Sequence, residues 1–246
     1  MALRVPDVIR IVPLRLEGAP PAPAAAPELT YRGGPLLANV EVVSVYWGAQ
    51  WRDEPLASFA RRLDGFLDFV LTSELMDQLA EYSVEGGAIG HGKRVGSSVL
   101  EDVPTDPVLS DGQLRDGLQS SLPLLPPPNA NALYAIFLPP NVAVVMGGSR
   151  SCQAFCGYHD AIDDEIFYAV LPYPGCPGCL GGDDEFDALT STTSHELAEA
   201  ITDPIPGTGW YDDAHGEIAD ICAWRTKRLG DYVVQLEWSN AARDCD

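Results

Sequence analysis

Apolar residues recur along the chain with two different periods, one typical of helices and one typical of strands. Between residues 54 and 71 they return every three or four positions, which places them on one side of a predicted helix. These residues are Phe59, Leu63, Phe66, Leu67 and Val70. Further helices are predicted at 73–80, where Ser73 can cap the first turn, and at 111–121.

Short runs rich in β-branched and aromatic residues predict strands. They lie at 40–47, 132–138, 142–146, 165–171 and 232–238. We expect the run at 40–47 to be the first ordered element. We also expect the runs at 132–138 and 142–146 to form a strand pair around Pro139-Pro140.

The order of these elements favours one domain of the α+β class. Strands and helices follow one another without regular alternation, so a mixed β-sheet packed on helices in layers is a better prediction than a doubly wound sheet. Residues 17–28 consist mostly of Pro and Ala and have little capacity to fold. We therefore predict a flexible N-terminal segment over residues 1–28 and a single domain over 29–246.

The stretch 190–204 is the part of the chain most suited to chemistry. It predicts a helix that ends at Asp203-Pro204, because a residue before proline is disfavoured in helical geometry. Positions four apart share one face of a helix, so His195 and Glu199 point the same way and Glu196 lies close by. This arrangement resembles the His-Glu-x-x-His helix of zincin metallopeptidases, with Glu199 in place of the second histidine.

A catalytic zinc needs three protein ligands and an open position. We assign His195 and Glu199 as two of them and Glu217, on a short second helix predicted at 217–222, as the third. Asp220 follows as a further ligand or as support for a ligand. Asp203, four positions beyond Glu199, remains an alternative third ligand.

These residues together predict a hydrolytic centre. Glu196 would act as general base on a water held by the metal, and the loop residues Tyr211 and His215 would stabilise a developing oxyanion; His215 is also a weaker candidate for the third ligand. Zinc is the expected cation, although one imidazole and two carboxylates also suit Mn²⁺ or Ca²⁺. The competing interpretation is that His195 is an ordinary helix histidine and that the glutamates form a solvated face.

The net charge of the chain limits the classes of partner that we expect it to bind. Its 36 acidic and 15 basic residues give a formal net charge of −21. Affinity for phosphate backbones depends on clustered Lys and Arg, so we expect no nucleic-acid partner, and an anionic membrane surface is disfavoured for the same reason. A peptide or protein is the expected substrate.

The six cysteines fall into three pairs that are close in sequence and predict an oxidising compartment. The pairs are Cys152 with Cys156, Cys176 with Cys179, and Cys222 with Cys245. We expect structural disulfides that brace the loop before the His195 helix and tie the C-terminal tail to the helix at 217–222. A four-cysteine zinc site built from the first four is the alternative. No signal peptide is visible in residues 1–16.

With these motifs in place, the chain resembles the plant phosphate-induced protein 1 (EXORDIUM-like) family and its bacterial relatives over most of residues 29–246. The similar segments are 31–35 with the run that follows to Trp47, 152–159, 176–179, 195–199, 210–211, 217–222 and 232–245. The resemblance implies a secreted, cell-wall or extracellular protein linked to growth, a family without a settled enzymatic activity. The family shares the His-Glu-x-x-Glu helix and tends to carry Asn at the position of Asp203, which weakens Asp203 as a ligand.

Two functional hypotheses follow. The first is a secreted zincin-like, zinc-dependent metallohydrolase, most simply a peptidase, that uses His195, Glu199 and Glu217 as ligands and Glu196 as base. The second is a non-catalytic extracellular protein in which the same residues hold a structural metal or only a hydrogen-bond network.

Overall fold

The fold is built on a six-stranded mixed sheet, seen in a computed structural model that describes residues 11–15 and 26–246. Across the sheet the order is β1 (Ile11–Pro13), β9 (Phe155–Ile162), β10 (Ile166–Leu171), β6 (Ala132–Phe137), β3 (Glu41–Trp47) and β4 (Lys93–Leu100). Strands β10, β6, β3 and β4 run parallel to one another, whereas β9 pairs antiparallel with both β10 and β1. The predicted α+β class with a mixed sheet is confirmed.

Helices and smaller sheets surround this central sheet. The α-helices are α1 (Leu56–Val70), α2 (Glu74–Leu79), α3 (Asp111–Ser121), α4 (Pro177–Leu180) and α5 (Glu185–Thr202). The 3₁₀ helices are η1 (Ala49–Arg52), η2 (Ala80–Tyr82), η3 (Leu122–Leu124) and η4 (Asp220–Cys222). The smaller sheets join β5 (Val108–Ser110), β7 (Ala143–Met146) and β8 (Ser149–Arg150); β2 (Thr30–Tyr31) and β11 (Trp210–Tyr211); β12 (Thr226–Leu229) and β13 (Tyr232–Gln235); and β14 (Trp238–Ser239) and β15 (Asp244–Cys245).

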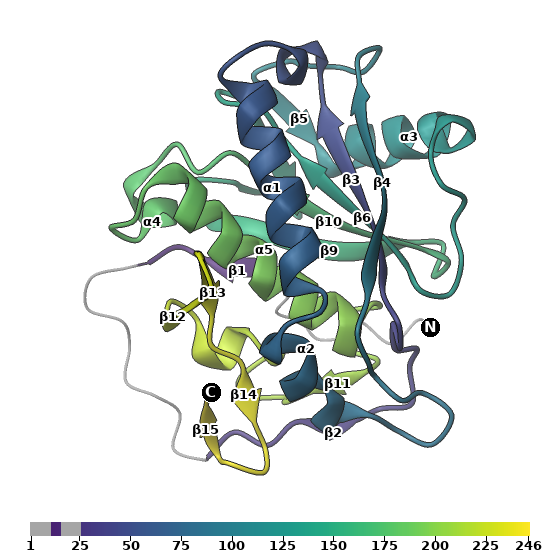
Figure 1. Ribbon diagram of the computed structural model, residues 1–246, viewed down its shortest axis with the longest axis vertical. Helices are drawn as coiled ribbons and strands as arrows, with labels where there is room; N and C mark the ends of the chain where they lie inside the picture. Colours follow the sequence, from purple (N-terminus) through teal and green to yellow (C-terminus); the bar gives the residue numbers. More distant parts are fainter. Residues whose placement is uncertain (1–10, 16–25) are drawn as a thin grey trace.

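The alternation of side chains along β3 creates a hydrophobic core on each face of the sheet. Val42 and Tyr46 belong to the core that contains α1 and α5, whereas Val43, Val45 and Trp47 belong to the core that contains α3. Figure 1 shows α1 and α5 lying across one face of the sheet, with α3 on the other side. The molecule is therefore layered, with helices on both faces of the sheet.

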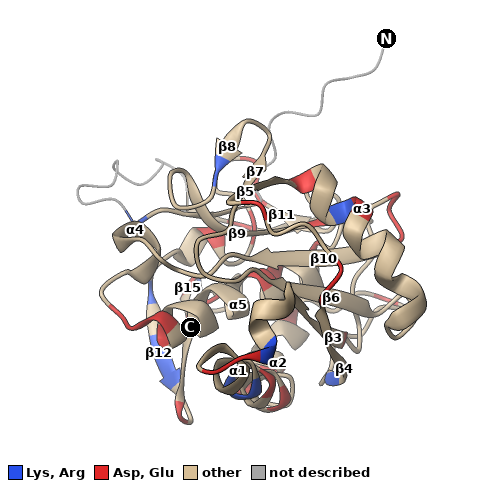
Figure 2. Ribbon diagram, turned by 90° about the horizontal axis from the view of Figure 1, so that it is seen from above, with Lys and Arg blue, Asp and Glu red and all other residues tan. Residues whose placement is uncertain are grey.

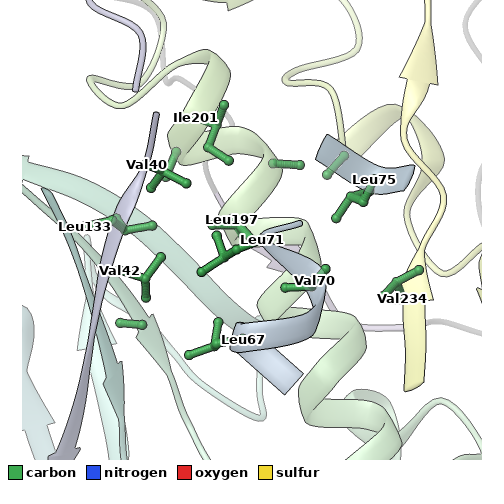
Figure 3. Packing of buried hydrophobic residues seen from close by; sticks show 14 of the residues in the cluster. Val40, Val42, Leu67, Val70, Leu71, Leu75, Leu133, Leu197, Ile201 and Val234 are labelled. Atoms are coloured by element: carbon green, nitrogen blue, oxygen red, sulfur yellow. The ribbon is translucent and has the colours of Figure 1, made fainter. Parts of the chain in front are cut away.

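Helix α5 is the most enclosed helix of the fold, because almost every residue from Phe186 to Thr202 is buried. Figure 3 shows Leu197 and Ile201 of α5 among apolar side chains from several elements, with Leu133 on the sheet side and Val70 and Val234 on the others. A helix that packs on all sides brings its polar residues into the interior as well. The polar residues of α5 are therefore buried together with its apolar ones.

Local capping determines where α5 begins and ends. The Asp184 carboxylate accepts hydrogen bonds from the backbone N–H groups of Phe186 and Asp187 and so caps the first turn. The helix ends at Thr202, immediately before Asp203-Pro204, as predicted. Its start at Glu185 lies upstream of the stretch at 190–204.

Several sequence-based predictions about strands are wrong. The runs at 132–138 and 142–146 do not pair, because β6 lies between β10 and β3 whereas β7 pairs with β5 and β8. The run at 40–47 is not the first ordered element, since β1 and β2 precede it, and β9 was not predicted. The predicted helix at 217–222 is only the 3₁₀ helix η4, and the run at 232–238 divides into β13 and the start of β14.

Three disulfides are present, as predicted, but two of the predicted pairs are wrong. The observed bonds join Cys152 to Cys176, Cys156 to Cys179, and Cys222 to Cys245. Cys156 lies on β9 and Cys179 on α4, and these two elements pack together. The cysteines at 152 and 156 therefore lie beside those at 176 and 179. All six sulfurs are used in these bonds, which excludes the four-cysteine zinc site.

The surface is rich in acidic residues, and the disulfides indicate an oxidising environment. Basic residues are scattered on β4, β8, β12 and α3, while acidic residues occur all around the fold (Figure 2). The three disulfides suggest an extracellular or otherwise oxidising compartment. Within the described residues, none of the helices combines the length and the apolar character needed to cross a bilayer.

Candidate metal centre

Helix α5 carries three buried ionisable side chains, with His195 and Glu199 on one face and Glu196 on the neighbouring face. His195 and Glu199 lie one helical turn apart, and the distance from His195 Nε2 to Glu199 Oε1 is 3.0 Å. Glu196 is turned toward β9. All three residues have no exposed surface, so the interpretation of the glutamates as a solvated face is wrong.

The 3₁₀ helix η4 brings Asp220 to the same place. Its Oδ1 lies 3.8 Å from His195 Nε2, and its backbone N–H donates a 3.2 Å hydrogen bond to Glu199 Oε1. Ligand atoms of His195, Glu199 and Asp220 all lie within 4.8 Å of one another. This spacing allows the three side chains to share one cation.

Hydrogen bonds of Gln235, on β13, determine which ring nitrogen of His195 carries a proton in the neutral ring. Gln235 Nε2 donates to the Ala219 carbonyl at 2.9 Å, and Gln235 Oε1 accepts the Trp224 N–H at 3.3 Å, which together define the orientation of the amide. Gln235 Oε1 is also 3.0 Å from His195 Nδ1, so Nδ1 must be the donor. In the neutral imidazole, Nε2 then carries a lone pair directed at two carboxylates, the arrangement typical of a metal-ligating histidine.

If the site holds a divalent cation, replacing Gln235 by Leu should weaken its binding by roughly 10- to 100-fold, because His195 Nδ1 would lose the acceptor that selects its tautomer. Zinc affinity would be measured by competition with a chromophoric chelator. Gln119→Leu, at an exposed position on α3, is the matched control and should bind zinc like the wild type. Unchanged affinity in a folded Gln235→Leu protein would refute this role for Gln235.

A second histidine, His159 on β9, lies on the other side of Glu199. Its Nδ1 is 3.2 Å from Glu196 Oε2 and 3.5 Å from Glu199 Oε2. Its Nε2 is 3.1 Å from the Asp203 carbonyl oxygen and 3.4 Å from Glu217 Oε1. Ligand atoms of His159, Glu196 and Glu199 form a second group with metal-binding spacing.

The close approach of β9 to α5 depends on a glycine. A Cβ atom at Gly157 would lie 2.8 Å from Thr192 Cγ2 and 2.9 Å from Glu196 Oε1, closer than real Cβ contacts allow. A larger residue would displace the Thr192 or Glu196 side chain, or the strand itself. Gly157 therefore permits the contact between His159 and Glu196.

The cluster contains more buried carboxyl groups than its two histidines can neutralise. In the described part of the chain, the ion pairs of Glu196, Glu199, Glu217 and Asp220 are all with the two histidines. Several buried atoms of these residues have no hydrogen-bond partner: His195 Nε2, Glu196 Oε1, Glu199 Oε2, Asp220 Oδ1 and both carboxylate oxygens of Glu217. Buried charges without partners are costly, and a bound cation would satisfy those of the residues that have metal-binding spacing, which exclude Glu217.

The pKa values of the cluster also reflect the excess of buried carboxyl groups over histidines. Burial raises the pKa of Glu217 and of Asp220 well above the usual range of a carboxyl group. Burial alone would lower the pKa of His195, but the surrounding carboxylates, Glu199 first, hold it well above its usual value. Glu199 is the exception, because the two histidines outweigh its burial and lower its pKa to about 2. Without a cation the cluster therefore holds protons, and a divalent cation would displace them.

The other residues proposed from the sequence lie around this cluster. The backbone N–H of Glu217 donates to Asp220 Oδ2 at 3.2 Å, while its carboxylate faces His159. The Asp203 carboxylate accepts N–H groups of the following turn at Gly207, Thr208 and Gly209, and it belongs to neither ligand group.

The two residues proposed for the oxyanion have other contacts. His215 Nδ1 contacts Asp212 at 2.7 Å, and His215 also belongs to neither ligand group. Tyr211 is buried on β11, with the Arg32 guanidinium 4.5 Å from the centre of its ring. These contacts lie in the turn and in β11, and the part of the two residues in oxyanion stabilisation stays a prediction.

Sequence reasoning missed His159 and Gln235 as members of the site. His159 lies on a strand that was not predicted, and its only signal was its place in the 152–159 segment of the family resemblance. Gln235 lies in a predicted strand at a buried position, where a polar residue interrupts an apolar run. That interruption was a usable signal, because a buried amide needs hydrogen-bond partners.

Comparisons with known proteins leave the function open. No protein-family model matches the chain, and no curated protein matches it significantly. The functional argument therefore depends on the geometry and the charge of this cluster.

Proposed function

We propose that this protein is an exported, zinc-dependent metallohydrolase whose cation is held by His195, Glu199 and Asp220. The observation that carries the proposal is the placement of His195 Nε2, which lies beside the oxygens of two buried carboxylates in a ring oriented by Gln235. One imidazole and two carboxylates leave one coordination position for water or substrate. Asp220 replaces Glu217 as the third ligand predicted from the sequence, since the Glu217 carboxylate faces His159 instead.

Glu196 is the general base in this proposal. A bound zinc ion supplies a Lewis acid that polarises a carbonyl and acidifies water. Glu196 follows the ligand His195 in the helix and its Oε1 has no hydrogen-bond partner, so it can accept a proton there. Burial raises the pKa of Glu196, which brings it closer to the neutral range where a base transfers protons efficiently.

Three observations support the finer parts of the proposal. The His-Glu-x-x-Glu helix against a mixed sheet is similar to the arrangement in zincins, which favours a peptide or protein substrate. The disulfides favour secretion, and the resemblance to the EXORDIUM-like family favours the same location. Mn²⁺ is an alternative cation, because the ligand set contains two carboxylates.

One observation favours a second function, that of a non-catalytic extracellular protein with a structural metal. His195, Glu196 and Glu199 are fully buried, and the Asp220 side chain is only 5% exposed. Structural metal sites are closed, whereas catalytic sites keep one position open to substrate. In this alternative the cation holds η4 against α5.

The variant Glu196→Gln separates the two functions. Elemental analysis of purified protein should find zinc in both wild type and variant, because Glu196 is outside the His195 ligand group. Hydrolysis of a broad peptide library should fall by roughly 10²- to 10⁴-fold in the variant, since the amide cannot accept a proton. Glu185→Gln, at an exposed position on the same helix, is the matched control and should retain wild-type activity.

The other outcomes are equally informative. Zinc without hydrolysis of any peptide would favour the structural alternative and refute the hydrolase. Protein that contains no metal and does not respond to added zinc would refute both functions.

A further inference from the structure

We propose that the cluster binds two divalent cations, with the Glu199 carboxylate as the bridge between them. The first lies at His195, Glu199 Oε1 and Asp220, and in this respect the inference rests on the proposed function. The second lies at His159 Nδ1, Glu196 Oε2 and Glu199 Oε2. Within each of the two ligand groups, the ligand atoms lie within 4.8 Å of one another.

The two oxygens of Glu199 face in different directions. Oε1 is 3.0 Å from His195 Nε2, whereas Oε2 is 3.5 Å from His159 Nδ1. Oε1 also accepts the Asp220 N–H, but Oε2 is buried and has no hydrogen-bond partner. A carboxylate with one oxygen toward each histidine has the geometry of a bridging ligand.

His159 is oriented in the same way as His195. Its Nε2 lies 3.1 Å from the Asp203 carbonyl oxygen, which can only accept, so Nε2 carries a proton. In the neutral ring, Nδ1 then directs its lone pair at Glu196 and Glu199. Each histidine thus donates a hydrogen bond from one ring nitrogen and directs the other nitrogen toward Glu199. The acceptor is Gln235 Oε1 for His195 and the Asp203 carbonyl for His159.

The separations at the second group fit a shared cation. Zinc binds nitrogen and carboxylate oxygen at about 2.0–2.2 Å in tetrahedral geometry, which places neighbouring ligand atoms about 3.3 Å apart. His159 Nδ1 lies 3.2 Å from Glu196 Oε2 and 3.5 Å from Glu199 Oε2. A proton on Nδ1 would be donated to the nearer oxygen and leave Glu199 Oε2 without a partner, whereas a cation binds both.

A second cation is compatible with the role of Glu196 as a base. Ligation through Oε2 leaves Oε1, which has no hydrogen-bond partner, free to accept a proton. Two cations that share one carboxylate typically lie about 3.5–4 Å apart and together hold a substrate oxygen. The nitrogen and oxygen ligands on both sides suit cations of borderline softness such as Zn²⁺ or Mn²⁺.

The number of bound cations tests the inference. Metal-free protein titrated with Mn²⁺ alone should bind two ions per chain, and the spectrum of electron paramagnetic resonance should show two spin-coupled ions. His159→Gln should bind one ion per chain and lose the coupled signal, since the His195 group remains complete. His91→Gln removes an exposed histidine that pairs with Asp77 and should bind two ions like the wild type.

One ion per chain in saturating Mn²⁺, without a coupled signal, would overturn the proposal even if His159→Gln failed to fold. It would mean that Nδ1 of His159 carries a proton instead. This failure is distinct from failure of the hydrolase. One ion with hydrolysis that depends on Glu196 would retain the proposed function, whereas two ions without hydrolysis would retain only the two-cation centre.

Discussion

Chelation should lower the thermal unfolding midpoint of the zinc-loaded protein by roughly 10 °C. A ligand that binds only the folded state at a thousand times its dissociation constant stabilises that state by about 4 kcal/mol. For a protein of this size, each kcal/mol shifts the midpoint by about 2–4 °C. The effect should be large here because the cation would compensate buried carboxylates whose oxygens otherwise have no partner.

Differential scanning calorimetry before and after chelation measures this shift. Adding zinc back in excess over the chelator should restore the midpoint. Adding magnesium instead should restore little of it, since magnesium prefers oxygen ligands in octahedral geometry and the site offers imidazole nitrogen. An unchanged midpoint after complete removal of the metal would show that the carboxylates are neutralised without a cation.

Removing the Cys222–Cys245 disulfide should reduce both stability and metal affinity. The bond closes a loop of 23 residues, and a loop of that length contributes about 3 kcal/mol to the free energy of unfolding. Cys222 is also the last residue of η4, whose first residue is the proposed ligand Asp220. The double variant Cys222→Ser/Cys245→Ser should therefore bind zinc more weakly, as measured by competition with a chelator.

The double variant Cys152→Ser/Cys176→Ser is the matched control. The Cys156–Cys179 bond still joins the same two segments in this variant, so the loss of stability measured by denaturant unfolding should be smaller than for Cys222–Cys245. Neither of its cysteines lies in an element that carries a ligand of the His195 group, so zinc affinity should remain close to wild type. Equal losses of affinity in both variants would show that general destabilisation, and not the position of η4, weakens the site.

The success of the helix predictions has a local cause. Helix α3 has the predicted bounds, and Ser110 and Gln113 form a capping box at its start. Ser73 caps α2 as expected by accepting the Leu75 N–H. Such signals lie within a few residues of the helix end that they determine, so they can be read directly from the sequence.

Predictions about pairing failed where the partner lay far away in the chain. β6 pairs with β3 and with β10, and neither of these could be chosen from the residues of β6 itself. The first four cysteines show the same difficulty. Pairs close in sequence were expected, whereas the observed bonds join Cys152 to Cys176 and Cys156 to Cys179. In each case a long-range contact decided between partners of similar local character.

The sequence alone determined the composition of the candidate centre on α5. Helical periodicity placed His195 and Glu199 on one face, and that spacing needed no tertiary information. Only the tertiary structure decided that these side chains are buried, that Asp220 joins them, and that His159 and Gln235 orient or extend the centre. The physical reason is that burial and ligand convergence depend on β9, η4 and β13 packing around α5, and these elements come from distant parts of the chain.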